Sequence, residues 1–265
     1  MKALAAIVFA MMMLSAPVRA DSQPVLTGNT DIHDPTLAIV DGTWLAFGTG
    51  QEGGLGQGAI RIKSSPDGLA WSDAGWLGKG VPAWTRDVLG YKPRNLWAPT
   101  ISAHKGTYYL YYAASSFGVQ VSAIGLMTNA HLDPRHPADG WQDQGLVLKS
   151  GNSDDFNAID PFRIDTPDGR AWLSFGSYWD GIRLVEIDPT SGKPLTGASY
   201  HKLATRFGAA IEASSILYHE GHYHLFVSYD RCCAGVASTY RIMVGRADAI
   251  TGPYFDQKGR PMLKG

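Results

Sequence analysis

The chain has 265 residues, with 23 lysines and arginines against 24 aspartates and glutamates. This near balance of charge argues against a nucleic acid or a membrane as partner, because an anionic partner selects for an excess of basic residues. Hydrophobic residues make up 45% of the chain, and its 31 glycines, 12 tyrosines and 8 tryptophans favour short strands joined by tight turns over long helices.

The first twenty residues have the pattern of an export signal. Lys2 supplies a positive charge, residues 3–17 are apolar, and Ala20 is a small residue suited to cleavage. The apolar run is too short to span a bilayer comfortably, and the alternative interpretation is a buried N-terminal helix. We expect residues 1–20 to be a signal peptide, and residues 21–265 to form one domain that is secreted or periplasmic.

One pattern then recurs along the chain: a short head, an apolar strand, a turn with glycine and an aromatic strand. The four units span 33–47, 97–112, 159–175 and 211–226. We expect third strands at 60–63, 123–127, 182–187 and 242–246, and fourth strands around Trp71, at 141–148 and around Tyr254. Such units are typical of propeller blades, so the sequence predicts an all-β propeller without helices of useful length.

The heads of the four units carry acidic residues. We match Asp34, Ala98, Asp160 and Glu212, because the first two precede a turn glycine by 8 residues and the last two by 9. The first strand of every blade lines the channel of a propeller, so matched residues face one another around the axis. Three of the four are acidic, which predicts a carboxylate cluster at one mouth of the channel.

A carboxylate cluster suits the cleavage of glycosidic bonds. That reaction needs a proton donor for the leaving oxygen and a base or nucleophile on the opposite side, and a third carboxylate can raise the pKa of the acid. The simpler alternative is that the acidic heads cap turns or bind a structural cation. Flat aromatic side chains near the heads, which could pack against sugar rings, favour the enzymatic interpretation; they are Trp97, Phe117, Tyr178 and Trp179.

Two further groups of residues leave alternatives open. Cys232 and Cys233 are adjacent, so they form either a vicinal disulfide, which would need a distorted or cis peptide, or a pair of free thiols. His222 and His224 share one face of a strand by alternation, which makes a metal pair conceivable. Isolated surface histidines are the commoner case, and we assign no metal ligand.

Five motifs in register resemble glycoside hydrolase family 43. They are HDP at 33–35, NLWAP at 95–99, NAIDP at 157–161, FGSYWDGI at 175–182 and IEAS at 211–214. The FGSYW and NAIDP motifs, with the later CC and STY, are similar to those of the endo-1,5-α-L-arabinanases. The resemblance runs from about residue 28 to residue 265 and implies a secreted enzyme that cleaves internal linkages of the pectic polysaccharide arabinan with inversion.

The resemblance also implies roles for individual residues. Asp34 matches the general base, Glu212 the general acid, and Asp160 the third carboxylate that tunes the acid. Substrate contacts map onto Asp34, Gly118, Asn157, Ala158, Ile159, Asp160, Ser177, Tyr178 and Trp179, beside the aromatic residues Trp97 and Phe117.

The family fold has five blades, whereas this sequence contains four units and stops at Gly265. We therefore expect the fifth blade to be missing or truncated. A fifth-blade histidine usually helps to hold calcium in the channel, so a calcium site is implied by the family but lacks that residue here. The alternatives to an endo-acting monomer are an exo-acting arabinofuranosidase or xylosidase on the same fold and a sugar-binding propeller without catalysis.

Overall fold

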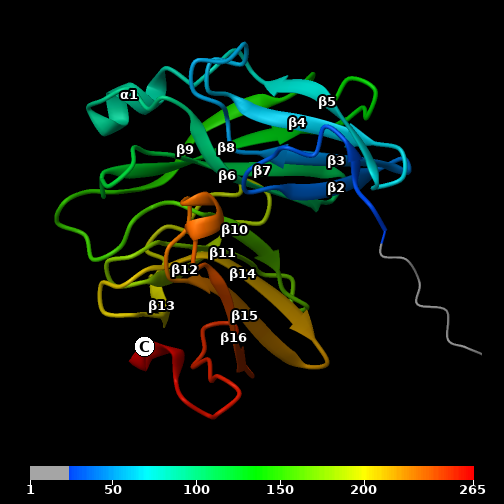
Figure 1. Cartoon of the computed structure of the whole chain (residues 1–265). Helices are drawn as coiled ribbons and strands as arrows, with labels where there is room; N and C mark the ends of the chain where they lie inside the picture. Colours follow the sequence, from blue (N-terminus) through cyan, green and yellow to red (C-terminus); the bar gives the residue numbers. More distant parts are fainter. Residues whose placement is uncertain (1–23) are drawn as a thin grey trace, which may run out of the picture.

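The computed structural model describes residues 24–265, and their regular secondary structure is almost entirely β-strand (Figure 1). The expected signal peptide at 1–20 lies outside the described residues. Within 24–265, no helix is long and apolar enough to cross a membrane. A helix that the sequence did not predict, α1 (Trp84–Leu89), follows the first sheet and ends at Gly90, whose φ of 74° suits a left-handed cap.

The strands form four sheets, one for each predicted unit. Blade 1 contains β2 (Thr36–Val40), β3 (Thr43–Gly48), β4 (Ile60–Ser65) and β5 (Ala70–Leu77), with β1 (Thr27–Gly28) parallel to β5. Blade 2 contains β6 (Leu96–His104), β7 (Thr107–Ala114), β8 (Ser122–Asn129) and β9 (Gln142–Ser150). Blade 3 contains β10 (Phe162–Asp165), β11 (Ala171–Phe175), β12 (Ile182–Ile187) and β13 (His201–Ala204). Blade 4 contains β14 (Ile211–His219), β15 (His222–Tyr229) and β16 (Arg241–Ala247).

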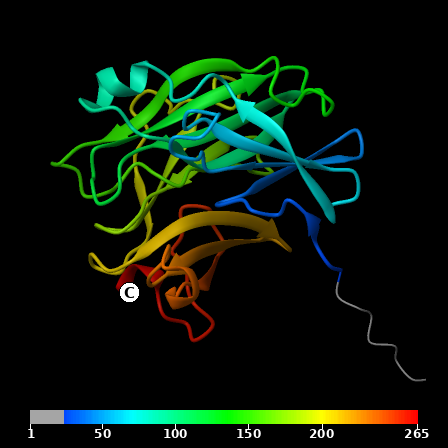
Figure 2. The same cartoon turned by 45° about the horizontal axis from the view of Figure 1, so that its top comes forward.

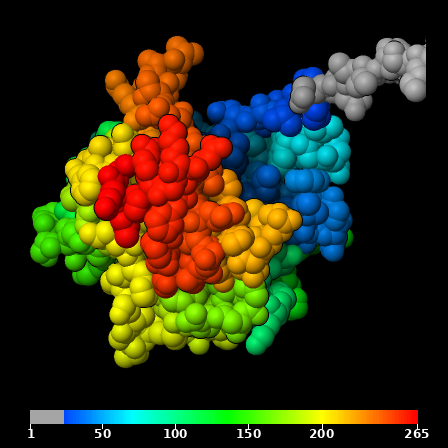
Figure 3. Space-filling model, turned by 90° about the horizontal axis from the view of Figure 1, so that it is seen from below, coloured from blue at the N-terminus to red at the C-terminus, as the bar shows by residue number. Residues whose placement is uncertain are grey.

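The fourth strand expected around Tyr254 does not form. Phe255 makes only isolated bridges, to Arg246 and to Pro261. Prolines at 253 and 261 explain the difference, since proline has no backbone N–H to donate to a ladder. The segment turns back instead to the short 3-10 helix η2 (Met262–Lys264), where the Met262 carbonyl accepts a hydrogen bond of 3.0 Å from Thr205 N. This C-terminal segment is red in Figure 3.

Three apolar layers hold neighbouring blades together. One joins blades 1 and 2 around Phe47 and Leu110, a second joins blades 2 and 3 around Tyr111 and Leu173, and a third joins blades 3 and 4 around Leu184. Sheets that are covered on both faces need side chains that are apolar on both faces, which explains the nearly continuous apolar runs of β7 and β11. Figures 1 and 2 show the resulting arrangement, with blades 1 and 2 in one half and blades 3 and 4 in the other.

Among the described residues, no such layer joins blade 4 back to blade 1. Leu37 and Ile39 on β2 are 51% and 56% exposed, and Ile242 and Val244 on β16 are 71% and 41% exposed. The structure thus shows four blades with apolar side chains on two outward faces. It does not confirm the five-bladed ring, or a truncated fifth blade.

A partly buried ion-pair network ties the inner strands of blades 2 and 3 together. Asp165 Oδ1 lies 2.8 Å from Arg163 Nε, and Asp165 Oδ2 lies 2.6 Å from His104 Nδ1. The Arg163 side chain is fully buried and stacks over the Tyr109 ring at 4.3 Å. Burial raises the pKa of Asp165, but hydrogen bonds and charge from Arg163 and His104 outweigh it, and the pKa lies below its ordinary value of 3.8.

We expect Asp165→Asn to destabilise the fold by about 3 kcal/mol at neutral pH, because it leaves the buried Arg163 guanidinium without its counter-charge. A carboxyl group whose pKa is lower in the folded protein than in the unfolded chain stabilises the fold fully when the pH is above its unfolded-state pKa. This contribution to the free energy of unfolding is lost as the pH falls through the folded-state pKa. The difference in Tm between wild type and variant should therefore shrink below about pH 4. The exposed Asp87, paired with Arg86, supplies the control Asp87→Asn. A Tm difference that is the same at all pH values would contradict the expectation.

Candidate active site

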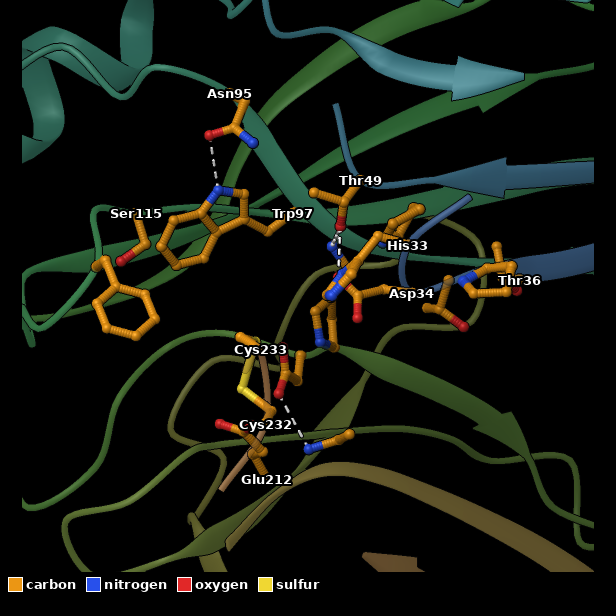
Figure 4. Close-up of a pocket in the computed structure, with 18 of the residues that line it drawn as sticks. His33, Asp34, Thr36, Thr49, Asn95, Trp97, Ser115, Glu212, Cys232 and Cys233 are labelled. Carbon is orange, nitrogen blue, oxygen red and sulfur yellow. Dashed lines mark hydrogen bonds and ion pairs between the residues drawn. A yellow bond between two sulfur atoms is a disulfide. The ribbon is translucent and has the colours of Figure 1, made fainter. Parts of the chain in front are cut away.

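Asp34, Asp160 and Glu212 come from three different blades and line one cavity of about 1020 Å³. Asp34 precedes β2, Asp160 precedes β10, and Glu212 lies in β14. Figure 4 shows Asp34 and Glu212 among the residues that line this cavity. The structure thus brings together three acids that lie up to 178 residues apart in the chain, since 212 − 34 = 178.

The repeated head has one backbone feature in every blade. Asp34, Ala98, Asp160 and Ala213 have φ values of 49°, 42°, 55° and 54°. In each blade, the residue two positions later starts the unbroken pairing of the innermost strand with the next strand. Thr36 pairs with Phe47 in blade 1, and Ser215 pairs with Phe226 in blade 4. Left-handed conformations at non-glycine residues are concentrated at functional sites, where the surrounding structure enforces them.

This feature corrects the match that the sequence predicted in the fourth blade. The residue equivalent to Asp34 and Asp160 is Ala213. Glu212 is instead equivalent to Trp97 of blade 2, because both pair with the second strand of their blade just before a β-bulge: Trp97 with Ala113, and Glu212 with Ser228. The error came from blade 3, whose turn between β10 and β11 contains the five residues 166–170 instead of two. Glu212 therefore reaches the cavity from the position before the left-handed residue.

Asp34 is held by two neighbours and stays open to solvent. Thr49 Oγ1 donates a hydrogen bond of 2.5 Å to Asp34 Oδ2, and His33 Nδ1 lies 2.6 Å from the same oxygen. Thr49 Oγ1 in turn accepts a hydrogen bond of 2.9 Å from Ala98 N in blade 2. The Asp34 side chain is 39% exposed. A carboxylate that is fixed on one oxygen and solvated on the other can accept a proton from a water molecule.

Asp160 is the acid with the most perturbed environment. Burial raises the pKa of Asp160 well above its ordinary value, the negative charges of Glu212 and Asp34 raise it further, and a hydrogen bond from Ala213 N opposes the shift. That hydrogen bond to Oδ2 is 3.0 Å long. A pKa raised by burial and by neighbouring carboxylates is characteristic of active-site acids.

Both carboxyl oxygens of Glu212 accept a hydrogen bond from a hydroxyl group. Ser177 Oγ donates to Oε2 at 2.8 Å, and Tyr240 Oη donates to Oε1 at 3.0 Å. Burial and then the Glu212 charge raise the pKa of Tyr240, so the phenol stays protonated and remains a donor. These contacts fix the orientation of the Glu212 carboxyl group toward the cavity.

A second cavity of about 530 Å³ adjoins the first. Trp97, Ser116 and Phe117 line both. The Trp97 indole is oriented by a 2.8 Å hydrogen bond to Asn95 Oδ1, whereas the Phe117 side chain is 84% exposed. The expected substrate contacts that line this second cavity are Trp97, Phe117, Gly118, Asn157, Ile159, Ser177, Tyr178 and Trp179.

Ala158 is the expected contact that lines neither cavity. It is fully buried in the apolar layer between blades 2 and 3, and its backbone N–H donates to Ser150 Oγ at 2.9 Å.

The first cavity is also lined by residues that the sequence did not single out as contacts. Among them, Thr49 and His33 contact Asp34, Tyr240 contacts Glu212, and Cys232 and Cys233 line the same cavity. Cys232 and Cys233 are joined by a disulfide across a trans peptide bond, which settles the choice between bridge and free thiols.

The described residues do not offer a metal site. In the range 24–265, no group of three or more His, Cys, Asp or Glu side chains is arranged to hold an ion. His222 Nδ1 lies 2.8 Å from Asp248 Oδ1, and the rings of His219 and His224 are 6.5 Å apart. Calcium takes six to eight oxygen ligands, and the residues present do not fit such a site, so we assign no step to a metal.

Comparison with known proteins agrees with this geometry. The family model of "Glycosyl hydrolases family 43" matches residues 22–265. An extracellular endo-α-(1→5)-L-arabinanase of Bacillus subtilis is 42% identical over 241 residues, which cover 89% of this chain and 71% of the relative. An extracellular exo-α-(1→5)-L-arabinofuranosidase of Cellvibrio japonicus is 38% identical over 247 residues, covering 89% and 69%. The solved endo-arabinanase of Bacillus licheniformis superimposes with a TM-score of 0.83 at 43% identity, covering 91% and 80%.

Proposed function

Because the chain belongs to the glycosyl hydrolases family 43, we propose that it cleaves internal α-1,5-L-arabinofuranosyl linkages of arabinan with inversion of configuration. The observation that carries the proposal is the meeting of Asp34, Asp160 and Glu212 at one cavity. Similarity to arabinan-cleaving relatives of 42% and 38% identity supports the choice of substrate.

The proposed reaction uses two of the acids directly. Asp34 removes a proton from water, whose oxygen attacks the anomeric carbon, while Glu212 donates a proton to the departing glycosidic oxygen. Asp160 is coupled to Glu212 by charge and fixes the head of blade 4 by accepting a hydrogen bond from Ala213 N. Asp34 gains a proton and Glu212 loses one, so exchange with solvent must restore both protonation states before the next turnover.

The adjoining cavities support binding of more than one sugar residue of the chain. The shared residues Trp97, Ser116 and Phe117 connect the acids with the aromatic side chains of Tyr178 and Trp179. The second cavity offers space for sugar residues beyond the one at the acids, and aromatic faces suit the apolar faces of sugar rings.

Product analysis on linear arabinan tests the mode of cleavage. We expect viscosity to fall severalfold while only a few per cent of the linkages are cut, because random internal cuts shorten the polymer faster than terminal cuts do. Chromatography should show oligosaccharides before free arabinose. Early release of a single small product at nearly constant viscosity would favour the exo-acting alternative. Retention of the enzyme on arabinan without any product would favour a sugar-binding propeller.

Three further expectations belong to this proposal. The extracellular relatives support export of the mature chain, which N-terminal sequencing of secreted protein would test. The exposed Leu37, Ile39, Ile242 and Val244 support a fifth blade that packs between blades 4 and 1 in the complete ring. We also expect a monomer, which sedimentation would distinguish from assemblies that cover the same apolar faces.

A further inference from the structure

The loop between β15 and β16 forms one wall of the catalytic cavity. Cys232, Cys233, Ser238 and Tyr240 line the cavity together with Glu212. In Figure 4 the disulfide is drawn beside the Glu212 side chain. The orange segment that includes this loop projects from the rest of the molecule in Figure 3. The disulfide is thus placed where a sugar bound next to Glu212 would meet it.

No apolar core holds this loop in place. None of the residues 231–240 is buried, and Val236 at the loop's 3-10 turn η1 (Gly235–Ala237) is fully exposed. Hydrogen bonds hold the loop to itself: Arg231 N donates to Thr239 Oγ1 at 3.2 Å and Ala234 N to Ser238 Oγ at 3.0 Å, beside short-range bonds of the backbone. Loops with few buried contacts open easily, so the covalent ring at 232–233 is its strongest internal constraint.

The backbone at the bridge is in an uncommon conformation. Cys233 has a φ of 61°, a left-handed value that non-glycine residues adopt only when their surroundings enforce it. Cys233 is one end of the bridge, and Tyr240, further along the same loop, donates to Glu212 Oε1 at 3.0 Å. The shape of the loop is therefore linked to the orientation of Glu212.

A disulfide is also a suitable surface for a sugar. Its two sulfur atoms are polarisable and form only weak hydrogen bonds, so they favour the C–H face of a furanose ring over its hydroxyl groups. On the blade-2 side the cavity has Trp97 and Phe117, which are likewise apolar. A furanose ring between these two walls would make apolar contacts on both sides.

We propose that the Cys232–Cys233 disulfide is a substrate-binding element: the arabinofuranosyl residue next to the scissile bond packs against its sulfur atoms. This inference rests on the proposed function, because it names a contact of the same site. It assigns a role to two residues that the acid–base mechanism does not use.

The double variant Cys232→Ala/Cys233→Ala tests the proposal. We expect KM on linear arabinan to rise about tenfold, the loss associated with removing a small apolar contact from a sugar site. Val236→Ala, a truncation of an exposed residue in the same loop that does not line the cavity, is the matched control and should leave KM unchanged. The Tm of each variant shows whether it folds.

Reduction of folded wild type gives an independent measurement. A dithiol such as dithiothreitol transfers two electrons and two protons to the bridge, which becomes two thiols while the dithiol closes to a cyclic disulfide. We expect KM to rise as thiols are titrated and to recover on reoxidation, whereas the double variant does not respond. Unchanged KM in both the reduced enzyme and the folded double variant would overturn the proposal. A wild type that cleaves no arabinan would instead overturn the proposed function.

Discussion

Replacing Glu212 by glutamine is expected to lower kcat on arabinan by about a thousandfold, since general acid catalysis typically contributes 10²–10⁴-fold. The amide has nearly the same shape, and the hydroxyls of Ser177 and Tyr240 lie 2.8 and 3.0 Å from the two carboxyl oxygens. The amide oxygen can accept from one of these hydroxyls, and the amide NH2 group can donate to the other. The amide cannot give up a proton to the leaving oxygen. KM should change little, because binding of the ground state does not require that proton.

The leaving group provides the decisive comparison for this variant. An aryl arabino-oligosaccharide with a nitrophenolate leaving group departs without protonation, so Glu212→Gln should lose far less activity on it than on arabinan. Glu220→Gln removes a carboxylate of the same type from the exposed hairpin of blade 4 and is the matched control. Equal losses on both substrates would show that Glu212 is not the general acid, and full activity on arabinan would remove the proposed mechanism.

Much of the fold could be predicted from the sequence, because strand alternation is a local property. The strand expected at 182–187 has the same bounds as β12, and the one expected at 242–246 lies inside β16 (Arg241–Ala247). The strand expected around Tyr254 failed because the prolines at 253 and 261 limit backbone pairing there. The short helix α1 has too few residues for a periodic signal.

The acids of the site could be found from the repeat, but their surroundings could not. Counting back from the turn glycines matched Glu212 with Asp160, because both precede their glycine by 9 residues. In blade 3 that distance includes the longer turn at 166–170, which the spacing alone does not reveal. Tyr240 and the disulfide at 232–233 lie in a loop that no other blade repeats. Their contacts with the cavity depend on how the chain folds back over blade 4, and no local pattern encodes that.

Asp34→Asn is expected to have an effect as large as that of Glu212→Gln, but with a different dependence on the substrate. Asparagine tolerates the left-handed φ of 49° at this position and can keep the hydrogen bond from Thr49 Oγ1. It cannot accept a proton from the attacking water, so kcat should fall by about a thousandfold on arabinan and on the activated aryl substrate alike. Steady-state rates on both substrates measure this directly.

An added anion separates loss of the base from loss of structure. Azide attacks without giving up a proton, so it should restore part of the activity of Asp34→Asn on the activated substrate and form a glycosyl azide of inverted configuration. The control is Asp41→Asn at the hairpin of the same blade, where φ is 48° and the same substitution removes a charge away from the cavity. An azide product of retained configuration would mean that a residue other than Asp34 acts as a nucleophile, because two displacements restore the configuration and the variant no longer has the Asp34 carboxylate. Absence of any rescue in a folded variant, with normal binding of arabinan, would mean that Asp34 does more than accept a proton from water.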